Sequence, residues 1–88
     1  MEKENFKREV FTKLNEIYAI TEASIYTYAG LDFISKRLEL FTNFFDSKIF
    51  KDVIENFEKR CTTDEDKIVL TELHKDFYLK KMTTIYSI

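Results

Sequence analysis

The chain has 88 residues and a mass of 10.6 kDa, which is the size of one domain. Hydrophobic residues make up 44% and charged residues 34%, a composition that allows a soluble domain with a packed core. There is no proline and one glycine, which argues against an all-β domain because such a domain needs many turns. The net charge of −2 excludes a strong overall attraction to nucleic acid. We therefore predict a single helical domain over residues 1–88.

The first expected helix covers roughly residues 3–28. Its apolar residues recur every three or four positions, at Phe11, Leu14, Tyr18, Thr21, Ile25 and Tyr28, and the stripe is widened by Phe6, Val10 and Ile17. This period is that of an amphipathic helix. Gly30 follows the last of these residues, at a place where a left-handed C-terminal cap favours glycine.

The next two expected helices cover about residues 31–45 and 47–61. The first carries an apolar stripe at Leu31, Ile34, Leu38, Phe41 and Phe45, and the second at Phe50, Val53, Phe57 and Cys61. Between them, Asp46 and Ser47 are good N-cap residues. No proline or glycine forces a break, so one continuous helix over 31–60 is the alternative; we favour the break.

The last expected helix covers about residues 63–82. Thr62 and Glu65 have the spacing of a capping box, and three acidic residues, at positions 64–66, suit the positive end of a helix. The uncharged runs 24–28 and 84–88 favour strands by composition and offer an alternative, a two-stranded cap on the core. We favour helix, because the helical stripe continues through the first run. The expected fold is an all-α, small antiparallel bundle of three to four helices that self-associates.

Nine phenylalanines and five tyrosines are more than the centre of one small bundle needs. We expect part of this apolar surface to face a protein partner of unknown identity. The residues that lie off the main stripes are the candidates: Ile20, Tyr26, Phe33, Leu40, Tyr78 and Tyr86. A homodimer would cover such surface most simply, since two-fold association is the commonest oligomer. Alternatively, four helices with wide apolar faces would bury all of these residues.

No residue pattern indicates catalysis, a cofactor or a metal site. One glycine excludes a glycine-rich phosphate loop, and a single cysteine with a single histidine cannot complete a zinc site. Cys61 and His74 are the one conceivable nucleophile and base. However, Cys61 falls on the apolar stripe of Phe57, where a free cysteine behaves as a small hydrophobic residue. We expect His74 to be half-exposed.

The charged residues are typical of solvated helix faces. The carboxylate pairs Glu55–Glu58 and Glu72–Asp76 each have lysines beside them. The basic clusters also have acidic residues within one helical turn; they are Lys7-Arg8, Lys36-Arg37, Lys59-Arg60 and Lys80-Lys81. This balance argues against a nucleic-acid-binding surface. No membrane span is expected, because the longest uncharged stretch, residues 23–31, is too short.

The sequence alone does not define the function. We expect a non-catalytic protein–protein interaction module: a small regulator, adaptor or inhibitor that docks an aromatic-rich helical face on a partner. The alternatives are a structural homo-oligomer or assembly subunit, and a nucleic-acid-associated regulator. A lone thiol favours a reducing, cytoplasmic compartment. The abundance of Lys, Ile, Phe, Tyr and Asn is typical of AT-rich genomes, such as those of many phages.

Overall fold

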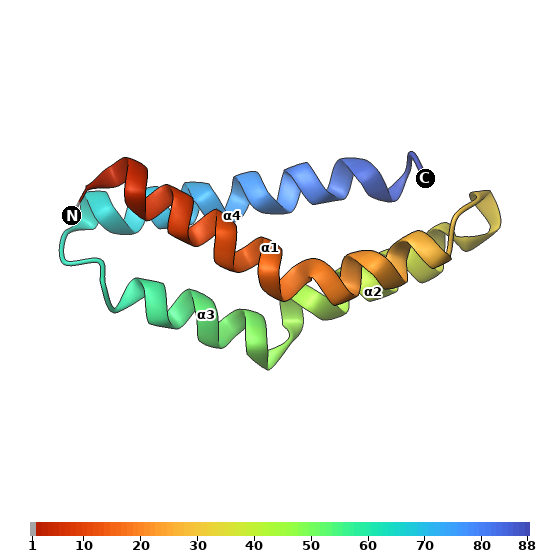
Figure 1. Ribbon diagram of the computed structural model, residues 1–88, viewed down its shortest axis with the longest axis horizontal. Coiled ribbons are helices and arrows are strands. Elements are labelled where there is room, and N and C mark those ends of the chain that lie inside the picture. The colour runs from red at the N-terminus through yellow and green to blue at the C-terminus, as the bar shows by residue number, and fades with distance from the viewer. Residues whose placement is uncertain (1) are drawn as a thin grey trace.

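The computed structural model describes residues 2–88, which contain α-helices and one short 3-10 turn but no strand. The elements in chain order are α1 (Lys3–Thr27), the 3-10 turn η1 (Leu31–Phe33), α2 (Ile34–Asp46), α3 (Lys48–Glu58) and α4 (Asp64–Ile85). Figure 1 shows that α1 and α4 run in the same direction, while α2 and α3, placed end to end, run back in the opposite direction. The prediction of a small all-α bundle is confirmed.

The helix boundaries lie close to the predicted ones, and the strand alternative is wrong for both runs. Residues 24–27 belong to α1, and α4 continues to Ile85, three residues beyond the predicted end. The second helix starts later than predicted, because residues 31–33 form the 3-10 turn η1. Leu31, predicted to lie on the buried stripe, is 81% exposed as a result.

Gly30 lies in the turn between α1 and η1 and has a positive φ of 104° with ψ of 158°. The prediction of a left-handed cap is therefore only half right. The C-cap of α1 is Tyr28. Gly30, two residues later, has a backbone conformation that is the mirror image of an extended residue. Such a φ favours glycine because a side chain would be strained there. The Gly30 amide donates to the carbonyl of Ile88 at 3.3 Å, which joins the turn to the end of the chain.

The break between α2 and α3 is confirmed at Ser47. This residue has an extended backbone, with φ of −72° and ψ of 152°, and its hydroxyl accepts a hydrogen bond from the Phe50 amide at 3.3 Å. An N-cap of this kind satisfies one of the amides that a helix start leaves free. Ser47 thus ends α2 with its extended backbone and caps the start of α3 with its hydroxyl, so the break needs neither proline nor glycine.

The cap of α4 is Thr63, and the predicted capping box of Thr62 with Glu65 is wrong. The Thr63 hydroxyl accepts from the Asp66 amide at 3.1 Å, since α4 begins one residue later than that motif requires. Glu65 instead forms an ion pair with Lys3 at the start of α1. The three acidic residues do occupy the first turn of α4, as predicted.

The core runs along the axis of the bundle and takes residues from all four helices. Its side chains pack edge to face around Tyr18, whose ring centroid lies 4.9 Å from that of Phe44 and 5.7 Å from that of Phe77. Most members were predicted from the periodicity; the buried apolar residues are Phe6, Val10, Leu14, Tyr18, Ile25, Phe41, Phe44, Phe50, Val53, Phe57, Cys61, Leu70, Leu73, Phe77 and Ile85. One buried residue, Arg37, is charged and was not predicted.

Replacing Ser47 by Ala is expected to lower the free energy of unfolding by about 1 kcal/mol, because the Phe50 amide loses its acceptor. For a domain of this size the melting temperature then falls by roughly 4–8 °C. Thermal unfolding followed by circular dichroism measures the change. Ser35→Ala, an exposed serine in the first turn of α2, is the matched control and should leave the melting temperature nearly unchanged. Equal losses in both variants would contradict the capping role of Ser47.

Candidate protein-binding surfaces

Five of the six residues predicted to face a partner are exposed. Ile20 and Tyr26 lie on α1, and Phe33 lies in η1. Tyr78 lies in the C-terminal half of α4, and Tyr86 directly follows that helix. Leu40 is half-buried and packs against the core, so it contributes chiefly to the fold. Tyr78 is the least exposed of the five, at 36%, and its ring lies 5.0 Å from those of Phe41 and Phe45.

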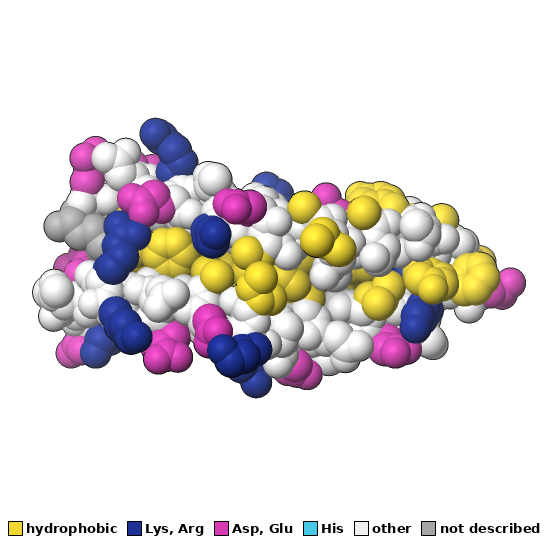
Figure 2. Space-filling model, turned by 60° about the horizontal axis from the view of Figure 1, so that its bottom comes forward, with side chains coloured by type: hydrophobic (Ala, Val, Ile, Leu, Met, Phe, Trp, Pro, Cys, Tyr) yellow, Lys and Arg dark blue, Asp and Glu magenta, His cyan; other side chains and the backbone are white. Residues whose placement is uncertain are grey.

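Three strongly exposed apolar residues, Leu31, Phe33 and Tyr86, share the end of the bundle at which α1 and α4 finish; we call them the apolar pole. They are 81%, 48% and 59% exposed. Phe33 packs against Tyr28, with ring centroids 5.8 Å apart. Figure 2 shows hydrophobic side chains spread over this end of the molecule, on the right, while most charged side chains on the visible face lie toward the opposite end. The apolar pole therefore places three exposed hydrophobic side chains at one end of the fold.

Arg37 lies beneath the apolar pole and is completely buried. Its Nε donates to the carbonyl of Ile85 at 2.7 Å, and its Nη1 donates to the carbonyls of Tyr28 and Gly30 at 2.6 and 2.7 Å. Its Nη2 has no hydrogen-bond partner in the described chain, and no carboxylate within residues 2–88 pairs with the guanidinium. One side chain of α2 thus ties together the ends of α1 and α4.

The charge of Arg37 is balanced by helix ends instead of a carboxylate. The C-terminus of a helix carries about half a negative charge, and a nearby cation stabilises it. Neither α1 nor α4 has a basic residue in its last turn. The guanidinium of Arg37 supplies the cation that both ends lack, and it satisfies the carbonyls of Tyr28 and Ile85. It is also a second donor to the Gly30 carbonyl, which accepts from the Phe33 amide at 3.2 Å.

Lys36 and Arg37 look like an ordinary basic pair in the sequence, and the burial of Arg37 was not predicted. The stripe predicted for this segment included Leu38, Phe41 and Phe45; Phe41 is buried as predicted, but the other buried residues of α2 are Arg37 and Phe44. A signal was present: position 37 lies four residues before Phe41 and so shares its face. A second signal was the absence of basic residues from the last turns of α1 and α4.

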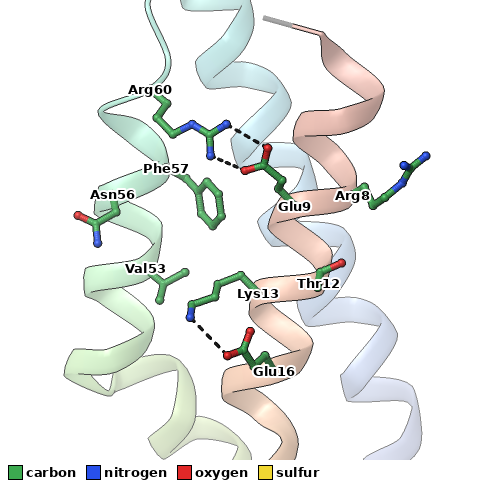
Figure 3. A pocket seen from close by; sticks show the side chains of 9 residues that line it. All are labelled: Arg8, Glu9, Thr12, Lys13, Glu16, Val53, Asn56, Phe57 and Arg60. Atoms are coloured by element: carbon green, nitrogen blue, oxygen red, sulfur yellow. Dashed lines mark hydrogen bonds and ion pairs between the residues drawn. The ribbon is translucent and has the colours of Figure 1, made fainter.

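A second candidate surface is the groove between α1 and α3, which has a cavity volume of about 470 Å³. Figure 3 shows Val53 and Phe57 on the α3 side of it, opposite Lys13 and Glu16 of α1, which pair at 3.6 Å. Arg8 and Thr12 also line the groove region but point away from α3 in this view. The floor is thus apolar and the rim is charged with both signs.

Arg60 closes one end of this groove. Its guanidinium forms two hydrogen bonds to Glu9, at 2.6 and 3.4 Å, and lies 5.6 Å from the ring centroids of Phe6 and Phe57. The hydrogen bond from Arg60 lowers the pKa of the Glu9 carboxyl below its usual value. This contact joins the segment after α3 to α1 but is exposed to solvent, so we expect a modest effect on stability.

The structure does not bring Cys61 and His74 together as a catalytic pair. The Cys61 thiol is buried and donates to the carbonyl of Phe57 at 3.4 Å, and burial raises its pKa, which disfavours the reactive thiolate. The His74 ring is half-buried, as predicted, and stacks on Phe45 with centroids 6.1 Å apart, next to Phe50 at 5.0 Å. Both residues therefore act as packing groups.

The remaining charged clusters are spread over solvated faces. All four members of the carboxylate pairs Glu55–Glu58 and Glu72–Asp76 are exposed. No group of three or more potential metal ligands occurs between residues 2 and 88. Over the same range, no helix is both long and apolar enough to cross a membrane.

Replacing Arg37 by Met is expected to destabilise the protein by about 3 kcal/mol, because three hydrogen bonds are lost and the buried carbonyls of Tyr28 and Ile85 are left without a donor, while the volume of the side chain is nearly kept. This corresponds to a fall of roughly 12–24 °C in melting temperature. Urea and thermal unfolding measure the loss. The neighbouring Lys36→Met is the control and should cost well under 1 kcal/mol, since its ion pair with Glu39 at 3.7 Å is exposed. A melting temperature of Arg37→Met equal to that of the control would disprove the role of Arg37.

His74 is expected to make folding sensitive to mild acid. Burial lowers its pKa from 6.5, so the unfolded chain binds a proton more readily than the folded one. The stability that this residue contributes is complete above pH 6.5 and declines as the pH falls from 6.5 to the lowered pKa of the folded state. His74→Phe keeps the stacking with Phe45 and Phe50 but cannot be protonated.

The measurement compares urea unfolding of wild type and His74→Phe between about pH 7.5 and 5. Nearby Lys51, Glu55 and Glu58 line the same cavity and are present in both proteins, so the difference between the two proteins isolates the replaced ring. The variant should gain stability relative to wild type as the pH falls. A difference that stays constant with pH would rule out His74 as the cause.

No protein-family model, no curated protein and no solved structure matches this chain. A role for any residue therefore cannot be carried over from a relative. Function has to be inferred from the surfaces of the chain itself, of which the apolar pole and the α1–α3 groove are the most developed.

Proposed function

We propose that this chain is a non-catalytic protein–protein interaction module, a small regulator, adaptor or inhibitor that docks its apolar pole on a partner protein. The exposure of Leu31, Phe33 and Tyr86 on one end of the bundle is the observation that carries the proposal. Aromatic side chains such as Phe33 and Tyr86 act as anchors that supply much of the binding energy at protein interfaces when a partner removes them from water. A buried, free Cys61 supports a reducing compartment such as the cytoplasm.

The rigidity of the apolar pole supports its use in binding. Arg37 fixes the backbone on both sides of it, through Tyr28 and Gly30 before η1 and Ile85 before Tyr86. The Gly30 amide adds a bond to Ile88. A surface that is already ordered loses little conformational entropy when a partner binds, which favours affinity.

The charge distribution supports a protein partner over nucleic acid. Each of the four basic clusters contributes at least one cation to an interaction with a carboxylate: Lys7 with Glu4, Lys36 with Glu39, Arg60 with Glu9, and Lys81 with Glu22. The cations are thus partly neutralised where they stand. Binding to nucleic acid needs a continuous basic surface that releases counterions, and the described residues form none.

The test uses the tagged protein as bait in lysate of its native host at moderate salt, with bound proteins identified by mass spectrometry. We expect one foreign protein in stoichiometric amount. The double variant Phe33→Ala/Tyr86→Ala should weaken its binding at least tenfold, because two anchor residues are lost. Its melting temperature should change by only a few degrees, since both side chains are about half exposed in the free protein.

Ile68→Ala is the matched control, because Ile68 is similarly exposed, at 58%, near the start of α4 and far from the apolar pole in the chain. It should bind the partner as the wild type does. Equal loss of binding in the control, or loss of folding together with binding in the double variant, would contradict the assignment of the apolar pole as the docking surface.

A further inference from the structure

A single charged side chain, the carboxylate of Asp32, accompanies the apolar pole. Asp32 lies between Leu31 and Phe33 in η1, and all three residues are exposed. In the two stretches of sequence around the pole, residues 23–35 and 82–88, no other side chain is charged. Figure 2 shows an acidic side chain at the right-hand tip of the molecule, beside the hydrophobic side chains of that end. The pole is thus uncharged except for one carboxylate.

Asp32 has no counter-charge in the described part of the chain. The nearest cation in the sequence is Lys36, whose ammonium group pairs with Glu39 at 3.7 Å and lies 5.8 Å from the ring centroid of Tyr28. The other nearby cation, Arg37, is buried and donates its hydrogen bonds to backbone carbonyls. Asp32 forms no ion pair within residues 2–88, so its carboxylate is left to the solvent.

A partner that covers the apolar pole would remove water from this carboxylate. Asp32 stands between Leu31 and Phe33 in a turn of three residues, so a surface that covers both neighbours also reaches Asp32. An ionised carboxylate that loses its water without gaining a counter-charge or hydrogen-bond donors opposes binding strongly. A partner that docks here therefore needs a positive charge opposite Asp32.

We propose that the partner of the apolar pole presents a cationic side chain, an arginine or a lysine, set among apolar residues. The cation pairs with Asp32, while the apolar residues cover Leu31 and Phe33. The exposed ring of Phe33 offers the same cation an aromatic contact. This inference rests on the proposed docking role of the pole and adds the chemistry of the surface that the pole recognises.

The same carboxylate disfavours other occupants of the pole. A second copy of this chain, docked pole to pole, would bring a second Asp32 instead of a cation, and like charges brought together at an interface weaken it. The phosphates of nucleic acid or of an anionic membrane would meet the same repulsion. Asp32 thus selects between partners by what it rejects as well as by what it binds.

Two small probes test the charge preference without the partner. Phenylbutylammonium and phenylpentanoate carry the same phenylbutyl group, the first with an ammonium and the second with a carboxylate. Titrations are followed in nitrogen–proton correlation NMR spectra. The ammonium probe should shift the amide signals of Leu31, Asp32 and Phe33, and it should bind roughly two- to fivefold more tightly than the carboxylate probe, as expected for an exposed ion pair.

Asp32→Asn keeps the size of the side chain and removes its charge. The variant should bind both probes equally, and its melting temperature should be nearly unchanged, because the carboxylate forms no ion pair in the described chain. Asp46→Asn, at an exposed site at the other end of α2, is the matched control and should keep the preference. Equal affinities of the two probes for the wild type, no shift of the η1 amides, or a preference that survives in Asp32→Asn would each overturn the proposal.

The partner identified by the pull-down provides the second test. Asp32→Asn should weaken its binding at least tenfold, because the cation of the partner then becomes buried without a counter-charge. Wild-type binding by Asp32→Asn, together with lost binding by Phe33→Ala/Tyr86→Ala, would overturn the cationic partner and leave the apolar pole as the docking surface. Failure of this inference and failure of the proposed function are therefore separate results.

Discussion

The rest of the structure depends on one buried charge that no carboxylate of residues 2–88 neutralises. Arg37 comes from the first turn of α2, yet its guanidinium is held by carbonyls from the two helices that α2 packs against. Moving a cation out of water is costly, and here three short hydrogen bonds and the negative ends of two helix dipoles offset the cost. The arrangement works only if α1 and α4 end at the same level, so Arg37 fixes the relative height of these two parallel helices.

That constraint shapes the surface above it. The guanidinium of Arg37 compensates the partial negative charge at the ends of α1 and α4. A partner could therefore cover the hydrophobic residues of the apolar pole without burying helix-end carbonyls that lack a hydrogen-bond donor. Gly30 contributes by its positive φ, which lets the chain reverse so that its carbonyl faces Arg37 while its amide bonds Ile88. The backbone geometry of the turn and the exposure of Phe33 and Tyr86 are thus consequences of the same contact.

Periodicity predicted well those parts of the fold that hydrophobic burial decides. The row Phe50, Val53, Phe57 and Cys61 is entirely buried, as expected, and the break at Ser47 followed from its capping ability. The spacing of Arg37 from Phe41 placed it on the buried face, but hydropathy assigns arginine to the surface, and the sequence does not show that backbone carbonyls at the ends of two other helices would accept its hydrogen bonds. The exposed candidate residues were predicted by exclusion, because a residue that lies off every apolar stripe does not face the core. The sequence does not show which of these residues lie close to one another in the fold.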